Sequence, residues 1–109
     1  MMGLVSTKEV VELFIVNYTY KVPENRIDRY LDIQRRTRKV YFGHGCIGYE
    51  VFKGDNDCWL EINKFKDREH YENIEKSVDA DPEIEILWKE FCSIVEKEKI
   101  VIKKYEQII

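Results

Sequence analysis

Two glutamates, Glu50 and Glu61, are the strongest candidates in this sequence for proton-transfer chemistry. They lie in consecutive β-rich segments joined by the short polar stretch 54–57, which predicts a hairpin. A turn of two or four residues there sets the two side chains opposite each other, with Cβ atoms about 4.5–5.5 Å apart. Two carboxylates at that distance repel each other and can share a proton, so the pair can act as acid or base, or bind a cation if Glu12 joins them. The alternative is that Lys103, or a basic side chain of a partner chain, neutralises the pair.

His44 is a third candidate for acid–base work, because imidazole titrates near neutrality. It follows Gly43 in a loop expected at one end of the sheet, although a histidine in a loop can equally be solvated and inert. The chain has two histidines and three cysteines, and no two cysteines form a C-x-x-C pair. We therefore expect no metal site. The sequence has neither a Gly-rich phosphate loop nor a recognisable Ser, His and Asp arrangement, and we expect no cofactor.

Aromatic side chains recur at alternate positions of the predicted strands, where they could stack on a flat aromatic ligand. One amide among them could orient a ligand carbonyl. These ligand-binding candidates are Phe14, Tyr18, Trp59, Asn63, Phe65 and Tyr105. The alternative is that the same rings only pack between two copies of the chain.

The elements that position these residues follow the order β-α-β-β-α-β. Strands are predicted over 10–21, 46–53, 58–66 and 99–107, from their content of β-branched and aromatic residues. A helix is predicted to begin near Pro23 and to end at Gly43, and a second begins after Asp67 and is split at Pro82. This is the ferredoxin-like α+β plan, an antiparallel four-stranded sheet with its helices on one face. Residues 10–109 are expected to form one domain, with 1–9 as a flexible N-terminus.

The alternation of side chains predicts which face of the sheet the helices cover. The covered set is aliphatic: Val11, Leu13, Ile15, Val51, Leu60, Ile62 and Ile102. The open set comprises Phe14, Val16, Tyr18, Phe52, Trp59, Phe65, Val101 and Tyr105, with Glu12, Glu50, Glu61, Asn63 and Lys103 among them. That open patch exceeds the few hundred Å² that a monomer usually exposes. A second copy packing sheet to sheet would bury it and form an eight-stranded barrel-like core with room for a small ligand.

Two segments carry a family resemblance. The heptapeptide 44–50, His-Gly-Cys-Ile-Gly-Tyr-Glu, resembles the helix-to-strand junction of the dimeric α+β barrel superfamily, and 61–71 resembles its third strand running into the second helix. This superfamily includes antibiotic-biosynthesis-type monooxygenases and NIPSNAP-like proteins. The resemblance implies a homodimer formed through the open sheet face, and a cofactor-free oxygenase- or isomerase-like activity.

Composition restricts the classes of protein further. Eighteen basic and twenty-one acidic residues give a net charge of −3, which argues against a dedicated nucleic-acid or membrane-surface protein. No apolar run approaches the roughly 18 residues of a membrane span, and the first residues do not resemble a signal peptide, so a cytoplasmic location is expected. Charged residues make up 36%, an enrichment typical of heat-adapted proteins.

Three functions remain open at this point. The first is a homodimeric enzyme acting on a small molecule, and the second is a non-catalytic ligand-binding or scaffold dimer. The third is a single-stranded RNA-binding module, since RNA-recognition motifs share the element order and present aromatics on an open sheet. The segment 58–65 lacks the glycines of those motifs, and Glu61 on the same face would repel phosphates. RNA binding is therefore the remote alternative.

Overall fold

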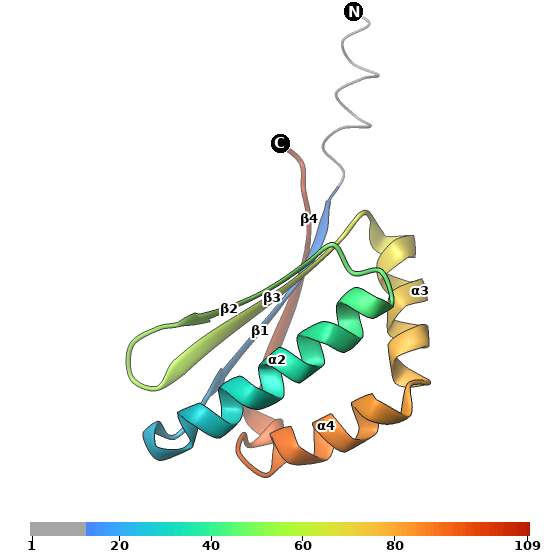
Figure 1. Ribbon diagram of the computed structural model, residues 1–109. Coiled ribbons are helices and arrows are strands. Elements are labelled where there is room, and N and C mark those ends of the chain that lie inside the picture. The colour runs from blue at the N-terminus through green and yellow to red at the C-terminus, as the bar shows by residue number, and fades with distance from the viewer. Residues whose placement is uncertain (1–12) are drawn as a thin grey trace, which may run out of the picture.

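Four antiparallel strands form a single sheet in the computed structural model, which describes residues 13–109 (Figure 1). The strands are β1 (Phe14–Lys21), β2 (Gly48–Lys53), β3 (Cys58–Phe65) and β4 (Val101–Glu106), in the order β2-β3-β1-β4. The helices are α2 (Ile27–Gly43), α3 (Arg68–Asp79) and α4 (Pro82–Cys92), with the 3-10 turns η1 (Glu24–Arg26) and η2 (Lys97–Lys99). The helices lie on one side of the sheet, so the predicted ferredoxin-like α+β fold is confirmed. The predicted N-terminus 1–9, and Val11 and Glu12, lie outside the described residues.

The second helical region begins and breaks where its capping residues predict. The Asp67 carboxylate accepts a hydrogen bond from the His70 backbone N–H at 2.7 Å and so begins α3. Asp81 accepts one from the Glu83 N–H at 2.9 Å, and Pro82 occupies the first turn of α4. The predicted split at Pro82 therefore produces two helices that meet at an angle (Figure 1). Within residues 13–109, none of these helices has the length and apolarity needed to cross a membrane.

The β2–β3 hairpin differs from the prediction by one residue. Its turn has three residues, Asp55–Asp57, because the Gly54 N–H bonds to the Cys58 carbonyl at 2.7 Å. Asn56 and Asp57 take the left-handed conformation, with φ of 55° and 62°. An odd number of turn residues shifts the pairing by one, so Val51 lies opposite Glu61. The predicted pairing of Glu50 with Glu61 is wrong: Glu50 lies opposite Ile62 and points to the other face.

The helices cover the aromatic face of β1 and β3 rather than the aliphatic one. One set was predicted on the open face and lies on the helix side: Phe14, Val16, Tyr18, Trp59, Glu61, Asn63 and Phe65. A second set was predicted under the helices and lies on the open face: Ile15, Leu60 and Ile62. The one-residue shift of register exchanges the two faces of β3, so each of its side chains lies on the face opposite to the predicted one. The other face of β1 carries the polar side chains Asn17, Thr19 and Lys21, so covering the aromatic face removes more apolar area from water. The predicted faces of β2 and β4 are correct, with Phe52 and Tyr105 on the open side.

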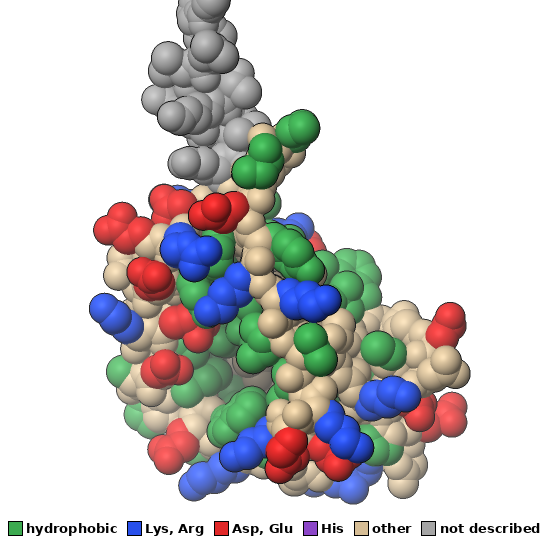
Figure 2. Space-filling model, turned by 180° about the vertical axis from the view of Figure 1, so that it is seen from behind, with side chains coloured by type: hydrophobic (Ala, Val, Ile, Leu, Met, Phe, Trp, Pro, Cys, Tyr) green, Lys and Arg blue, Asp and Glu red, His purple; other side chains and the backbone are tan. Residues whose placement is uncertain are grey.

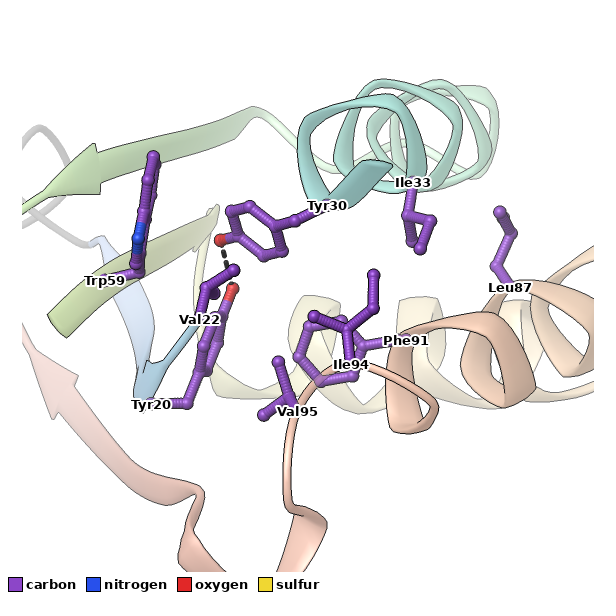
Figure 3. Close-up of a cluster of buried hydrophobic side chains, with 9 residues drawn as sticks. All are labelled: Tyr20, Val22, Tyr30, Ile33, Trp59, Leu87, Phe91, Ile94 and Val95. Atoms are coloured by element: carbon purple, nitrogen blue, oxygen red, sulfur yellow. Dashed lines mark hydrogen bonds between the residues drawn. The ribbon is translucent and has the colours of Figure 1, made fainter. Parts of the chain in front are cut away.

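The core consists of two clusters, one at each end of the sheet. In the first, the Trp59 ring lies 5.0 Å from Tyr30, and Tyr20 lies 5.1 Å from Phe91 on α4 (Figure 3). The second packs Phe14, Phe65 and their neighbours against Ile74 and Val78 of α3. α3 therefore covers one end of the sheet and α4 covers the other. The middle of the sheet lies between the two clusters.

The hairpin turn provides a test of the register. We expect Asp57→Val to lower the free energy of unfolding by about 1–2 kcal/mol, because a β-branched residue is strained at positive φ. Asp55→Val is the matched control, since Asp55 is not among the positive-φ residues of the described chain. Urea unfolding measures both. An equal loss in the two variants would contradict the assigned turn.

Candidate functional site

A cavity of about 840 Å³ lies between the helix-facing side of the sheet and the helices α2, α3 and α4. Its polar wall consists of the tyrosines Tyr18, Tyr20, Tyr41 and Tyr49 and the carboxylates Glu61, Glu75, Asp79, Asp81 and Glu85, together with Gln34 and Thr37. It opens along β4, all six residues of which are exposed. Seen from behind, the surface is hollowed at this place, and hydrophobic side chains surround the hollow (Figure 2).

The break between α3 and α4 explains why the cavity lies there. α3 packs on the cluster containing Phe14 and Phe65, whereas α4 packs on the cluster containing Tyr20 and Trp59. Tyr18 contacts both clusters and lies opposite Glu61 in the β1–β3 register. The centre of the sheet is therefore where neither helix fills the space.

Glu61 is the most unusual group on the wall. It is only 8% exposed, and none of the ion pairs formed by residues 13–109 includes it. Its Oε1 accepts hydrogen bonds from the Tyr20 hydroxyl at 3.1 Å and from Gln34 Nε2 at 3.5 Å. Burial raises the pKa of this carboxyl above its usual 4.5, and the Tyr20 hydrogen bond offsets part of that rise. Glu61 therefore holds its proton to higher pH than an ordinary glutamate.

A hydrogen-bonded network surrounds that carboxyl. The Tyr20 and Tyr30 hydroxyls lie 2.6 Å apart (Figure 3), and Gln34 Nε2 donates to Tyr20 at 3.3 Å. The Tyr49 hydroxyl donates to Gln34 Oε1 at 2.5 Å. Burial raises the pKa of Tyr20 and Tyr49 well above the ordinary tyrosine value, so both hydroxyls stay protonated and remain donors. All the groups bonded to Glu61 are thus neutral.

Four further carboxylates lie on the wall nearer α3 and α4, namely Glu75, Asp79, Asp81 and Glu85. Glu75 accepts a hydrogen bond from the Tyr41 hydroxyl at 3.3 Å, and burial together with the neighbouring Asp79 raises its pKa. Asp81 is bonded to His44 Nε2 at 2.8 Å, and this contact lowers the pKa of Asp81. His44 therefore ties the end of α2 to the start of α4 and is not itself part of the wall.

The structure brings two of the predicted site residues together, Glu61 and Tyr18. Glu50 lies on the opposite face of the sheet, where its carboxylate pairs with Lys64 Nζ at 3.1 Å. Phe14, Trp59 and Phe65 are core residues. Asn63 is completely buried, with neither atom of its amide hydrogen-bonded, and Tyr105 is exposed on the open face. None of these last five lines the cavity.

Several wall residues were not among the predicted candidates. Sequence reasoning missed Tyr20, Gln34, Tyr41, Tyr49, Glu75 and Asp79. One signal was available, because Gln34 falls in the apolar stripe of α2 between Tyr30 and Tyr41 and is only 5% exposed. A buried amide requires hydrogen-bond partners, and here they are the tyrosines and the carboxyl of the cavity.

Comparison with known proteins identifies the fold. No family model and no curated protein matches the chain. Among solved structures, a conserved protein from Methanosarcina mazei Go1 superposes with a TM-score of 0.74 at 12% identity, covering 93% of this chain and 98% of that one. A NIPSNAP family protein of unknown function from Agrobacterium tumefaciens gives 0.69 at 17% identity, with 89% of each chain covered.

A third similar structure is that of SnoaB, a cofactor-independent oxygenase from Streptomyces nogalater. It superposes with a TM-score of 0.68 at 10% identity, over 92% of this chain and 96% of that chain. The resemblance found in segments 44–50 and 61–71 is therefore confirmed at the level of the fold.

Replacing Glu61 by Gln tests the burial of the carboxyl. Because the pKa of Glu61 is raised in the folded state, the unfolded chain gives up this proton first as pH rises. The free energy of unfolding of the wild type therefore falls from about pH 4.5 up to the folded-state pKa of Glu61. Gln keeps an oxygen for Tyr20 and carries no charge. We expect Glu61→Gln to gain roughly 1 kcal/mol over the wild type at mildly alkaline pH. The gain should disappear in acid.

Thermal unfolding across pH measures this difference. Glu50→Gln is the control, because Glu50 is exposed and should show no such pH-dependent gain. A loss of stability in Glu61→Gln at every pH would mean that the ionised carboxylate is stabilised in the folded protein.

Proposed function

Because the chain shares its fold with NIPSNAP proteins and a cofactor-independent oxygenase, we propose that it binds a small organic molecule in the cavity between sheet and helices and moves a proton on it. The observation that carries this proposal is Glu61, a buried carboxyl held by neutral donors inside a cavity. The cavity volume lies within the roughly 300–1,000 Å³ typical of ligand sites.

The arrangement around Glu61 suits reversible proton transfer. Tyr20 and Gln34 both bind Oε1, and Oε2 lies outside these two bonds. A carboxyl whose pKa is raised toward neutrality is effective both as base and as acid. Oε2 can take a proton from a carbon next to a carbonyl and return it to another position of the same molecule. This isomerase-like cycle balances without a further reactant.

We also propose that two copies associate through the open face of the sheet. That face carries Phe52, Val101 and Tyr105, each close to half exposed, beside Leu60 and Ile62 of β3. An apolar patch of this kind is typical of a protein–protein contact. Packing the two sheets against each other covers it on both copies by the same symmetric contact.

Proton abstraction can be measured without knowing the natural substrate. The test compound is 2-tetralone, a bicyclic ketone with acidic protons on the carbon between ring and carbonyl. In D₂O, we expect the wild type to accelerate hydrogen–deuterium exchange at that carbon by about tenfold or more over Glu61→Gln, followed by NMR. Glu50→Gln should exchange like the wild type. Equal exchange by wild type and Glu61→Gln would contradict a role for Glu61 as base.

The oligomer is tested by light scattering on a sizing column. The wild type should have twice the chain mass of 13.2 kDa. Ile62→Asp places a charge on the open face and should give a monomer with an unchanged circular dichroism spectrum. Lys53→Asp changes a charge at the exposed end of β2 and should leave the mass unchanged. A wild-type mass of 13.2 kDa would exclude the dimer.

A further inference from the structure

We propose that the molecule bound in this cavity is a cation, specifically a protonated amine attached to an aromatic or fused-ring hydrocarbon. This inference rests on the proposed binding function and adds the chemical class of the ligand. It is carried by the charge of the cavity wall, by which of its carboxylates have partners, and by the rings between them.

All the charged side chains of the wall are acidic. Its ionisable groups apart from the tyrosines are the five carboxylates Glu61, Glu75, Asp79, Asp81 and Glu85, and within the described part of the chain no Lys, Arg or His side chain lines it. A cavity walled by one sign of charge concentrates ligands of the opposite sign. The ionised carboxylates would repel a carboxylate or phosphate ligand, and no cation among residues 13–109 lines the wall to attract it.

Two of those carboxylates stand together without a basic partner on the wall. Glu75 and Asp79 are four residues apart on α3, so they lie on the same face of the helix. Asp79 contributes to the raised pKa of Glu75, which indicates that their negative charges repel each other. The positive charge of Lys104 lowers the pKa of Glu75 and offsets part of that rise. The Lys104 Nζ, however, lies 5.0 Å from the centre of the Tyr71 ring and does not line the wall. A ligand ammonium group beside Glu75 and Asp79 would relieve that repulsion.

The other carboxylates are arranged differently. Asp81 is already bonded to His44, so it has less need of a ligand cation. Glu61 lies deeper and has only neutral partners, although it is nine-tenths buried. A buried carboxylate without a cation is costly, and a bound cation in the cavity would lower that cost. The deep and the outer carboxylates therefore favour the same sign of ligand.

Aromatic rings on the wall supply the second part of the recognition. Tyr18 and Tyr41 stand near the carboxylates, and Trp88 of α4 is 49% exposed where it lines the cavity. Trp88 stacks on Phe91, with ring centres 5.7 Å apart. Aromatic faces attract ammonium groups and stack on hydrocarbon rings.

The spacing of the carboxylates distinguishes an organic cation from a metal ion. Among residues 13–109, no three His, Cys, Asp or Glu side chains converge closely enough to hold a metal. The negative groups are instead distributed over β3, α3 and α4 around an open volume. Such a distribution fits a cation attached to a larger organic body.

A matched set of three compounds tests the class of ligand. They share one bicyclic skeleton and differ in one group: 2-aminotetralin is a cation, 2-tetralol is neutral, and tetralin-2-carboxylate is an anion. We expect the amine to bind the wild type about tenfold more tightly than the alcohol, and the carboxylate most weakly. The preference should shrink in about 1 M salt, which screens charge. Calorimetry measures the affinities, and protein NMR shifts locate the site.

Variants then identify the carboxylates responsible. Glu75→Gln combined with Asp79→Asn should reduce the ratio of amine to alcohol affinity by about fivefold or more. Glu72→Gln removes a charge from the exposed face of the same helix, outside the wall, and should leave that ratio unchanged. Circular dichroism checks that each variant is folded. If the double variant were unfolded, Glu75→Gln alone should still reduce the ratio.

The outcomes separate this inference from the proposed function. If the alcohol binds in the cavity as tightly as the amine, the ligand class is wrong while the binding function stands. If the ratio is the same in the wild type and the Glu75 variants, these carboxylates do not select the ligand and the inference fails. If none of the three compounds binds, both the inference and the binding function are overturned.

Discussion

The three-residue turn between β2 and β3 determines which side chains of β3 the helices enclose. Strand side chains alternate, so an odd turn directs Glu61 and Trp59 inward and leaves Leu60 and Ile62 on the open face. The position of Glu61 in the cavity depends on this register. With Glu61 inside, Tyr20 and Gln34 have a buried acceptor, and Tyr49 reaches the same network through Gln34. The left-handed conformation of Asn56 and Asp57 therefore sets the register that places Glu61 in the cavity.

The sequence predicts the order of elements well and the faces of the sheet poorly, and the reason is the range of the interactions involved. Caps such as Asp67 and Asp81 act on backbone groups two or three residues away, so their effect is visible in the sequence. Register instead depends on the φ angles of two turn residues that tolerate several turn types. In the segment that forms β1, Leu13 and Ile15 make one face apolar at its start, whereas Asn17, Thr19 and Lys21 make the same face polar further along. The helices pack on the opposite, aromatic face.

The candidate site also combines residues that the local sequence indicates with residues that depend on how distant elements pack. Glu61 was predicted as a site residue through its pairing with Glu50, which is wrong, and Tyr18 as an aromatic side chain on a strand. Tyr41, Glu75 and Asp79 look like ordinary helix residues, and they form a wall only when α2 and α3 are placed beside the sheet. Burying Glu61 also opposes stability, since ionising it in the folded chain is unfavourable. A group kept at such a cost is characteristic of a functional site.

The angle between α3 and α4 has a consequence for how this fold can vary. Val78 of α3 packs in one cluster and Leu87 of α4 in the other, whereas Ile84 of α4 contacts both clusters. Ala80 and Asp81 connect the two helices in the chain. A change at Ala80 or Asp81 that altered the angle between the helices would therefore require Ile84 to repack against both clusters. The volume of the cavity and the packing of the core are therefore coupled, because a ligand of another size would require a different helix angle and with it a different contact of Ile84.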